Sequence, residues 1–236
     1  MIGTGVALGR VGFLAMKRDR TRTMARILAA ASKEFADKGY DGARVDKIVR
    51  RSGLNKQTMY HYFGSKERLF QAVLEQMYAT IRTHQQKLQL LDLAPEEAMR
   101  ALIEGTFDVF VERPEFFNLI ASENLCKARH IRRSDKIIPL YMPLTDTIDA
   151  LLRRGVTAGV FRTGVDPVDL YITIAGLGGY YLANGHTLSA LLGDDLLTPQ
   201  RLKRRYEHVI EVVLSYLRTP AVTPSGHHSR EKLPAS

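Results

Sequence analysis

The sequence is poor in cysteine and has no long apolar run. Cys126 is the single cysteine among 236 residues, which excludes an internal disulfide framework and a cysteine-rich zinc site. A membrane helix needs about 18 consecutive apolar residues, and no run reaches this length. Residues 1–16 are mildly apolar, but Arg10 interrupts them and no basic segment precedes them, unlike a secretory signal. These absences predict a cytoplasmic protein with no membrane partner.

The motifs of common enzyme classes are also missing. There is no glycine-rich phosphate loop, no Gly-x-Ser-x-Gly, no His-Glu-x-x-His and no carboxylate–histidine cluster at metal-ligand spacing. The glycines at 176, 178 and 179 do not have the spacing of a dinucleotide-binding loop and follow no predicted strand. We therefore expect no enzyme activity, no cofactor and no metal, and we expect Cys126 to be a buried, unreactive thiol.

Positive charge is in excess, and the excess lies near the N-terminus. Lysine and arginine number 34 against 25 acidic residues, for a net charge of +9. Residues 1–80 hold 15 basic and 7 acidic residues, whereas residues 81–236 hold 19 and 18. This asymmetry is typical of a basic module that binds nucleic acid. A basic membrane-surface protein is the alternative, but the basic segments are broken by turns and do not form one long amphipathic helix.

Hydrophobic periodicity predicts helices throughout the chain and no strand. Apolar residues recur at helical spacing, and prolines or glycines separate the segments, so the expected fold class is all-α. The expected helices span residues 21–38, 44–51, 56–62, a longer segment after Ser65, and then 95–112, 114–127, 137–158, 168–183 and 199–217. Residues 184–198 are expected to form a loop, residues 1–20 a disordered leader and residues 219–236 a disordered tail. Met16 is an alternative start.

The first three predicted helices have the layout of a helix-turn-helix, with Ser52 and Gly53 in the turn. The second short helix of such a unit enters the major groove and brings its N-terminal residues to base edges. The predicted base contacts are Asn55, Lys56, Gln57 and Thr58, and the predicted contacts to the DNA backbone are Arg44, Lys47, Tyr60, His61 and Lys66. Leu54 and Met59 are expected to face the core of this module.

The run from Gly53 to Leu69 resembles the signature of the TetR family of bacterial transcriptional regulators. It reads GLNKQTMYHYFGSKERL, and the resemblance extends without gaps over residues 22–72. It implies a three-helix DNA-binding domain, closed by a fourth helix, and a larger helical domain that dimerises and holds an effector pocket. It also implies that Lys56, Gln57 and Thr58 approach bases while Tyr60, His61 and Lys66 hold the backbone. The expected domains are residues 21–66 and 67–218.

The last two predicted helices are the candidates for a dimer interface. One face of the segment 199–217 is apolar. The helix before it carries three glycines. Glycine weakens a helix, so three of them need a reason, and close packing of another backbone is one. Clearance for a ligand and a local kink are the alternative reasons for these glycines. The resemblance implies a four-helix dimer bundle formed by these helices. The predicted interface residues are Gly176, Gly179, Tyr206, Val209, Ile210, Val213 and Leu217.

The effector pocket is expected to combine aromatic walls with a few polar groups. The predicted lining residues are Phe107, Phe110, Phe117, Asn124, Tyr141, Thr145, Thr173 and Tyr180. His130 lies in a basic stretch, residues 127–133, and is expected at the surface; in the pocket it would favour an anionic ligand.

Together these patterns predict a DNA-binding transcriptional regulator. The expected protein is a repressor that binds a palindromic operator in double-stranded DNA as a homodimer, and a small-molecule effector releases it. The alternative is the same DNA-binding dimer acting as an activator or without a small-molecule ligand.

Overall fold

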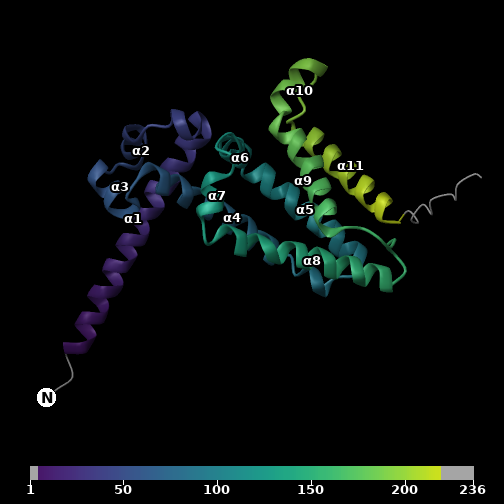
Figure 1. Cartoon of the computed structure of the whole chain (residues 1–236), viewed down its shortest axis with the longest axis horizontal. Helices are drawn as coiled ribbons and strands as arrows, with labels where there is room; N and C mark the ends of the chain where they lie inside the picture. The colour runs from purple at the N-terminus through teal and green to yellow at the C-terminus, as the bar shows by residue number, and fades with distance from the viewer. Residues whose placement is uncertain (1–4, 219–236) are drawn as a thin grey trace, which may run out of the picture.

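The structure, a computed structural model, describes residues 5–218, with side chains from Arg18 onward (Figure 1). Over that range it contains helices and no strand, which confirms the predicted all-α class. The α-helices are α1 (Gly5–Gly42), α2 (Val45–Ser52), α3 (Lys56–Phe63), α4 (Lys66–Gln86), α5 (Pro95–Glu112), α6 (Glu115–Leu125), α7 (Arg129–Arg133), α8 (Ile137–Thr157), α9 (Pro167–Ala183), α10 (Gly185–Leu192) and α11 (Pro199–Arg218), and η1 (Leu90–Asp92) is a short 3₁₀ helix. The predicted tail lies outside the described residues.

A compact N-terminal unit is formed by the second part of α1, by α2 and α3, and by the start of α4. Its core holds the apolar positions that repeat at helical spacing, such as Ile27, Ile48 and Met59, each fully buried. Phe35 of α1 meets Phe70 of α4 edge to face with ring centroids 4.8 Å apart. This contact fixes α4 against α1 and so closes the unit.

Local signals set the ends of the short helices. Gly53 adopts φ +64° in the turn between α2 and α3, a conformation that favours glycine. Arg26 of α1 reaches this turn and donates to the Ser52 carbonyl at 2.7 Å. Asn55 caps α3 as predicted, because its Oδ1 accepts the Thr58 N–H at 2.8 Å. The Arg26 contact thus holds the turn before α3, and the Asn55 cap fixes where α3 begins.

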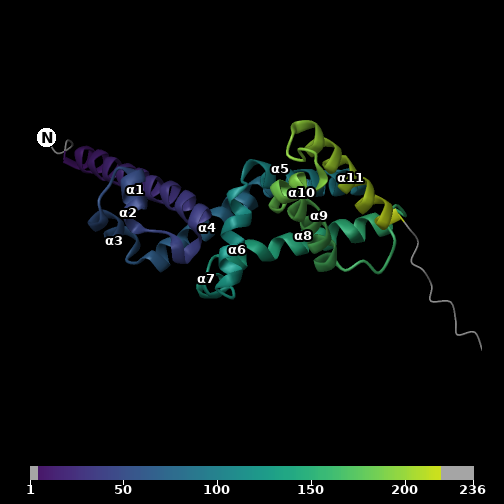
Figure 2. The ribbon, with the colours of Figure 1, turned by 90° about the horizontal axis from the view of Figure 1, so that it is seen from above.

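The remaining helices form a second core around α5, α8, α9 and α11. Leu102, Ile148, Leu151 and Leu217 are completely buried in it. Two views show α1–α3 at one end of the molecule and α9–α11 at the other, with α4, α6 and α7 between them (Figures 1 and 2). The helix α4 belongs to both parts, since it packs on α1 and also on α5 and α8.

Two segments differ from the sequence-based expectation. Residues 5–20, expected as a disordered leader, are helical and continuous with α1, since this stretch contains no proline and several strong helix formers. Within the expected loop 184–198, the structure has α10. Gly185 is the first residue of α10, and Gly193 caps its C-terminus with φ +68°. The two glycines therefore stand at the ends of the helix and do not interrupt it.

None of the described helices combines the length and the apolar composition needed to cross a membrane.

Candidate DNA-binding surface and ligand cavity

The helix α3 presents a polar face outward and an apolar face inward. Met59 is fully buried and Phe63 nearly so, which anchors α3 to the N-terminal core. Lys56, Gln57 and His61 are exposed, and Tyr60 keeps 45% of its surface accessible. The exposed positions fall on one side of the helix because they are spaced by one, four and five residues. The predicted inward orientation of Met59 agrees with its burial, and Leu54 packs partly buried against the same core.

Two of the predicted base contacts have their side chains engaged at the helix end. The Asn55 Oδ1 accepts from the Thr58 amide at 2.8 Å and from the Thr58 hydroxyl at 2.9 Å. This capping arrangement leaves the Asn55 amide nitrogen as a donor for other partners. Lys56 and Gln57 are the first two residues of α3 after the Asn55 cap, and both are exposed. They are the predicted base contacts that α3 exposes most directly.

Lys56 pairs with a carboxylate on the neighbouring helix. Its Nζ lies 2.7 Å from Asp46 Oδ1 of α2, and both side chains are more than half exposed. The hydrogen bond and the charge of Asp46 raise the pKa of Lys56, so its ammonium stays charged. A DNA phosphate or base near α3 therefore competes with Asp46 for Lys56.

Arg44 and Lys47 flank the start of α2, and both are exposed. The Arg44 backbone amide donates to Glu34 Oε1 of α1 at 3.3 Å, which ties the start of α2 to α1. Lys66 is more restricted, because its Nζ donates to the Asp41 carbonyl at 3.2 Å and lies over the Tyr40 ring. Lys66 therefore holds the C-terminal end of α1 against the start of α4, and its predicted contact with DNA phosphate stays a prediction.

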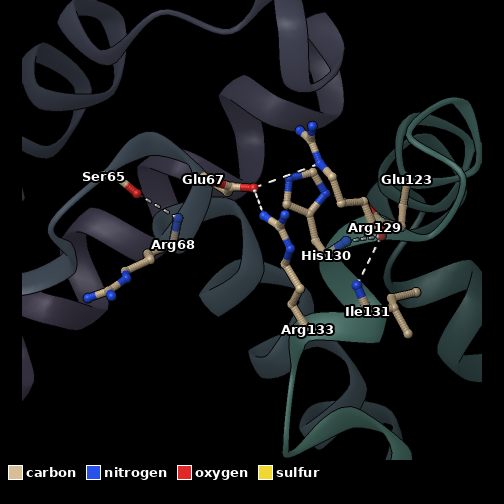
Figure 3. A network of polar contacts seen from close by, with 8 residues as sticks. All are labelled: Ser65, Glu67, Arg68, Glu123, Arg129, His130, Ile131 and Arg133. Carbon is tan, nitrogen blue, oxygen red and sulfur yellow. Dashed lines mark hydrogen bonds and ion pairs between the residues drawn. The ribbon is translucent and has the colours of Figure 1, made fainter.

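A buried polar pair lies where the N-terminal unit meets α6 and α7 (Figure 3). Glu123 Oε2 lies 2.6 Å from His130 Nδ1, and its Oε1 accepts the backbone N–H groups of His130 and Ile131 at 2.7 and 3.0 Å. His130 is 1% exposed, so the expectation that it lies at the surface is wrong. The sequence does not predict the short helix α7, in whose first turn His130 lies. The first amides of a helix need acceptors, and the buried Glu123 carboxylate accepts those of His130 and Ile131.

The His130 ring also contacts the N-terminal unit. It packs 4.7 Å from the Tyr40 ring and 4.9 Å from the Phe70 ring, measured between centroids. The Tyr40 amide donates to the Ser122 hydroxyl of α6 at 2.7 Å. The helices α6 and α7 are thereby attached to the unit that carries α3.

Glu123, Cys126 and His130 bring three potential metal-ligand atoms within 4.8 Å of one another. The Glu123 carboxylate and His130 Nδ1 already satisfy each other and the first amides of α7. Burial raises the pKa of the Cys126 thiol, and the charge of Glu123 acts in the same direction. Since a thiolate is the form that binds metals and reacts, this environment favours a protonated, unreactive thiol.

A cavity of about 160 Å³ lies among α4, α5, α6, α8 and α9. Its lining residues are Tyr78, Ile81, Arg82, Gln85, Thr106, Val109, Phe110, Phe116, Ile120, Leu140, Tyr141, Leu144 and Tyr171. Phe110 and Tyr141 are thus brought to the cavity as predicted. Burial raises the pKa of Tyr78 to about 12, so its hydroxyl stays protonated. Burial also raises the pKa of Tyr171, whose hydroxyl is hydrogen-bonded to Tyr141.

The other predicted lining residues do not reach this cavity. Phe107 packs in the core against Tyr206, with ring centroids 5.6 Å apart, and Phe117 packs against Phe110 beside Gly179. The Thr145 hydroxyl donates to the carbonyl of Met142. Asn124, Thr173 and Tyr180 are exposed. The sequence marks aromatic residues on many helix faces, but which faces surround a common space depends on the packing of five helices.

Arg82 and Gln85 are polar lining residues that were not predicted from the sequence. They follow Tyr78 and Ile81 at helical spacing on α4, so all four lie on one face. Arg82 Nη1 lies 3.4 Å from Gln85 Oε1, and burial lowers the pKa of Arg82. The sequence offers one indication of this, because Arg82 interrupts the apolar stripe of α4 directly after Ile81.

The predicted dimer residues of α11 lie inside the subunit. Val209, Ile210, Val213 and Leu217 are at most 3% exposed and pack in the core with α5 and α9, so they cannot form a surface between two copies. An apolar helix face indicates burial, but it does not say whether the same chain or a second chain covers it.

The other predicted dimer residues differ in their surroundings. Tyr206 packs partly buried against the same core, and Gly179 lies beneath the Phe117 ring. Gly176 is open, since no atom lies within 4 Å of the place that a Cβ would occupy. Around Gly176, α9 exposes Ile172 and Tyr180 at 60% and 65% of their surface.

The chain is similar to known transcriptional regulators over most of its length. Residues 27–73 match the family described as bacterial regulatory proteins, tetR family, and residues 95–213 match the family described as tetracyclin repressor-like, C-terminal domain. The HTH-type transcriptional repressor NicS of Pseudomonas putida is 38% identical over 192 residues, covering 81% of this chain and 89% of NicS.

Two further proteins are more distant. The HTH-type transcriptional activator FasR of Mycolicibacterium smegmatis is 25% identical over 169 residues, covering 72% of this chain and 75% of FasR. The crystal structure of PfmR, a TetR family transcriptional regulator from Thermus thermophilus, superposes with a TM-score of 0.63 at 26% identity, covering 80% of this chain and 97% of PfmR.

Proposed function

The chain belongs to the TetR family of bacterial transcriptional regulators, and from this premise we propose that two copies bind a palindromic DNA site and repress transcription from it. The exposed polar face of α3, anchored by Met59 and Phe63, carries this proposal. Lys56 and Gln57 would contact base edges, and Arg44, Lys47 and Tyr60 would contact phosphates. The name of NicS, a repressor, favours repression over activation.

A second copy would pack on the outer face of α9. Ile172, Gly176 and Tyr180 are spaced by four residues and form one exposed stripe. The neighbouring helix α11 exposes two further apolar or aromatic side chains, Val212 and Tyr216. An exposed apolar stripe of this kind is typical of a protein–protein interface. A helix-turn-helix dimer places two reading helices about one DNA turn apart, which matches a palindromic site.

The cavity beside Arg82 would hold a small-molecule effector. Its lining includes residues of α4 and α6, and these two helices also contact the unit that carries α3. A ligand that binds one arrangement of these helices better than another shifts the population of dimers able to bind DNA. The effector would release the repressor in this way. A regulator that binds DNA would act in the bacterial cytoplasm.

The activity of FasR as an activator keeps activation as the second candidate function. A promoter–reporter measurement distinguishes the two, because deleting the gene raises expression from a repressed promoter and lowers expression from an activated one.

DNA binding by the full chain tests the proposal most directly. The probe is a duplex from the intergenic region upstream of its own gene, competed with random duplex of equal length. Specific binding should persist over the competitor and weaken by about 10³–10⁵-fold between 50 and 200 mM salt if roughly 6–10 phosphates are contacted. Equal affinity for both duplexes would contradict a sequence-specific regulator.

A further inference from the structure

Arg82 is a charged side chain without a charged partner. Its Nε is buried and has no hydrogen-bond partner among the described residues, and its Nη1 donates one long hydrogen bond of 3.4 Å to Gln85 Oε1. No ion pair among the described residues includes Arg82, although Arg82 also lines a second cavity whose lining includes Asp92. A partly buried cation without a partner is unfavourable unless something else satisfies it.

The walls around Arg82 are apolar and aromatic, and the remaining polar groups are neutral. Phe110, Phe116 and Ile120 supply apolar surface, while the hydroxyls of Tyr78 and Tyr171 and the amide of Gln85 supply hydrogen-bonding groups. Tyr hydroxyls that stay protonated can donate to an oxygen anion. The lining residues include no aspartate or glutamate, so the charge of the cavity is that of Arg82.

The volume sets the size of the occupant. An engineered cavity of about 150 Å³ holds one benzene ring, so a cavity of about 160 Å³ has room for one ring. The aromatic walls favour a flat or cyclic apolar body. A guanidinium in such a wall favours a planar oxyanion, because it can donate two parallel hydrogen bonds to a carboxylate.

We propose that this cavity recognises a small carboxylate anion carried on a single ring, with Arg82 as the group that pairs with the carboxylate. The inference rests on the proposed function only in taking the cavity as the effector site. It adds the chemical class of the effector and the residue that selects it. Gln85 is the positioning residue in this arrangement, because its Oε1 accepts from Arg82 and orients the guanidinium.

Matched pairs of neutral and charged probes test the proposal. Benzoate, phenylacetate and cyclohexanecarboxylate are titrated calorimetrically into the full-length protein, each beside its own carboxamide. At least one acid should bind more tightly than its amide by about tenfold, which corresponds to about 1.4 kcal/mol. Equal or tighter binding of every amide, or no measurable binding of any acid up to millimolar concentration, would overturn the proposal.

Two variants of Arg82 separate recognition from a structural role. Arg82→Met should remove the preference for acid over amide and leave amide binding unchanged, whereas Arg82→Lys should keep part of the preference. The ligand-free Arg82→Met protein should unfold at the same temperature as wild type or higher, because an unpaired cation is lost. Retention of the full acid preference by Arg82→Met would contradict the assignment of Arg82.

A third variant tests whether the cavity is the binding site, separately from whether Arg82 selects the carboxylate. Ile120→Phe fills the cavity and should abolish binding of acids and amides alike in the same calorimetric titrations. If the acids bind Ile120→Phe as well as wild type, the cavity is not the site and the inference fails. Loss of duplex binding by wild-type protein, measured separately, would instead contradict the proposed function.

Discussion

Arg133 Nη1 of α7 lies 2.6 Å from Glu67 Oε1 in the first turn of α4, although the two residues are 66 positions apart. Arg129 contacts the same carboxylate oxygen at 3.7 Å. Two helix turns further along, Glu75 of α4 binds Lys136 and Ser134 just after α7. Since α4 also carries Tyr78, Ile81 and Arg82 into the cavity, it links the proposed effector site to the unit that holds α3.

The buried pair of Glu123 and His130 should contribute more stability than the exposed pair of Glu67 and Arg133. Glu123→Gln leaves the amides of His130 and Ile131 competing for a weaker acceptor and should lower the free energy of unfolding by about 1–3 kcal/mol. Arg133→Gln removes a pair whose side chains are 61% and 39% exposed, and should cost less than about 1 kcal/mol. Urea unfolding of both variants beside wild type gives the comparison. Equal losses would contradict the larger contribution of the buried pair.

Gln57→Ala should relax base preference without abolishing DNA binding. Gln57 is exposed and is the second residue of α3. The N-terminal residues of a recognition helix are the ones that approach base edges. The loss of discrimination at one base pair of each half-site should be about 1–3 kcal/mol. Binding to operators mutated one position at a time measures it, with Gln200→Ala on α11 as the exposed control. An unchanged position profile would exclude Gln57 as a base contact.

Asp46→Asn should strengthen DNA binding. Asp46 holds Lys56 at 2.7 Å and places a negative charge beside the recognition helix. Because exposed ion pairs contribute little to stability, the variant should unfold like wild type while its DNA affinity rises by up to about fivefold at low salt. Asp149→Asn on α8 removes a comparable pair with Arg153 and serves as the control. Weaker DNA binding by Asp46→Asn would mean that the pair positions Lys56.

The unit that carries α3 could be predicted from the sequence because its signals are local. Asn55 caps the helix that follows it, and Gly53 supplies the positive φ that the turn requires. The dimer face and the cavity depend on which helices meet. Periodicity marks Val209 and Val213 as buried but does not reveal that α5 and α9 of the same chain cover them. Likewise, α7 is only five residues long and is held by Glu123, whose role no sequence pattern indicates.

Ile172→Glu should disrupt the proposed dimer without unfolding the subunit. Ile172 is 60% exposed on α9, so a carboxylate there is solvated in a single subunit but desolvated between two copies. The protein should sediment as a monomer, and its affinity for a palindromic duplex should fall while circular dichroism stays unchanged. Thr163→Glu, in the exposed loop before α9, controls for the added charge. An unchanged dimer would place the interface elsewhere.

The contact between α4 and the segment after α7 should weaken in acid. Burial alone would raise the pKa of Glu75, but hydrogen bonds from Lys136, Gln71 and Ser134 outweigh it and hold this pKa below the ordinary value of 4.5. The unfolded chain therefore binds a proton at Glu75 more readily than the folded chain does. The stabilisation by Glu75 is complete above the unfolded pKa and is lost as pH falls through the folded value.

Glu75→Gln tests this dependence. The variant should be less stable than wild type at neutral pH, and the difference in unfolding free energy should shrink as pH falls from about 5 toward about 3. Glu96 pairs with Arg218 and has a lowered pKa of its own, so wild type and variant both lose that contribution, which cancels in the difference. Urea unfolding at several pH values provides the measurement. A difference that stays constant over this range would mean that Glu75 contributes through packing and hydrogen bonds independent of its charge.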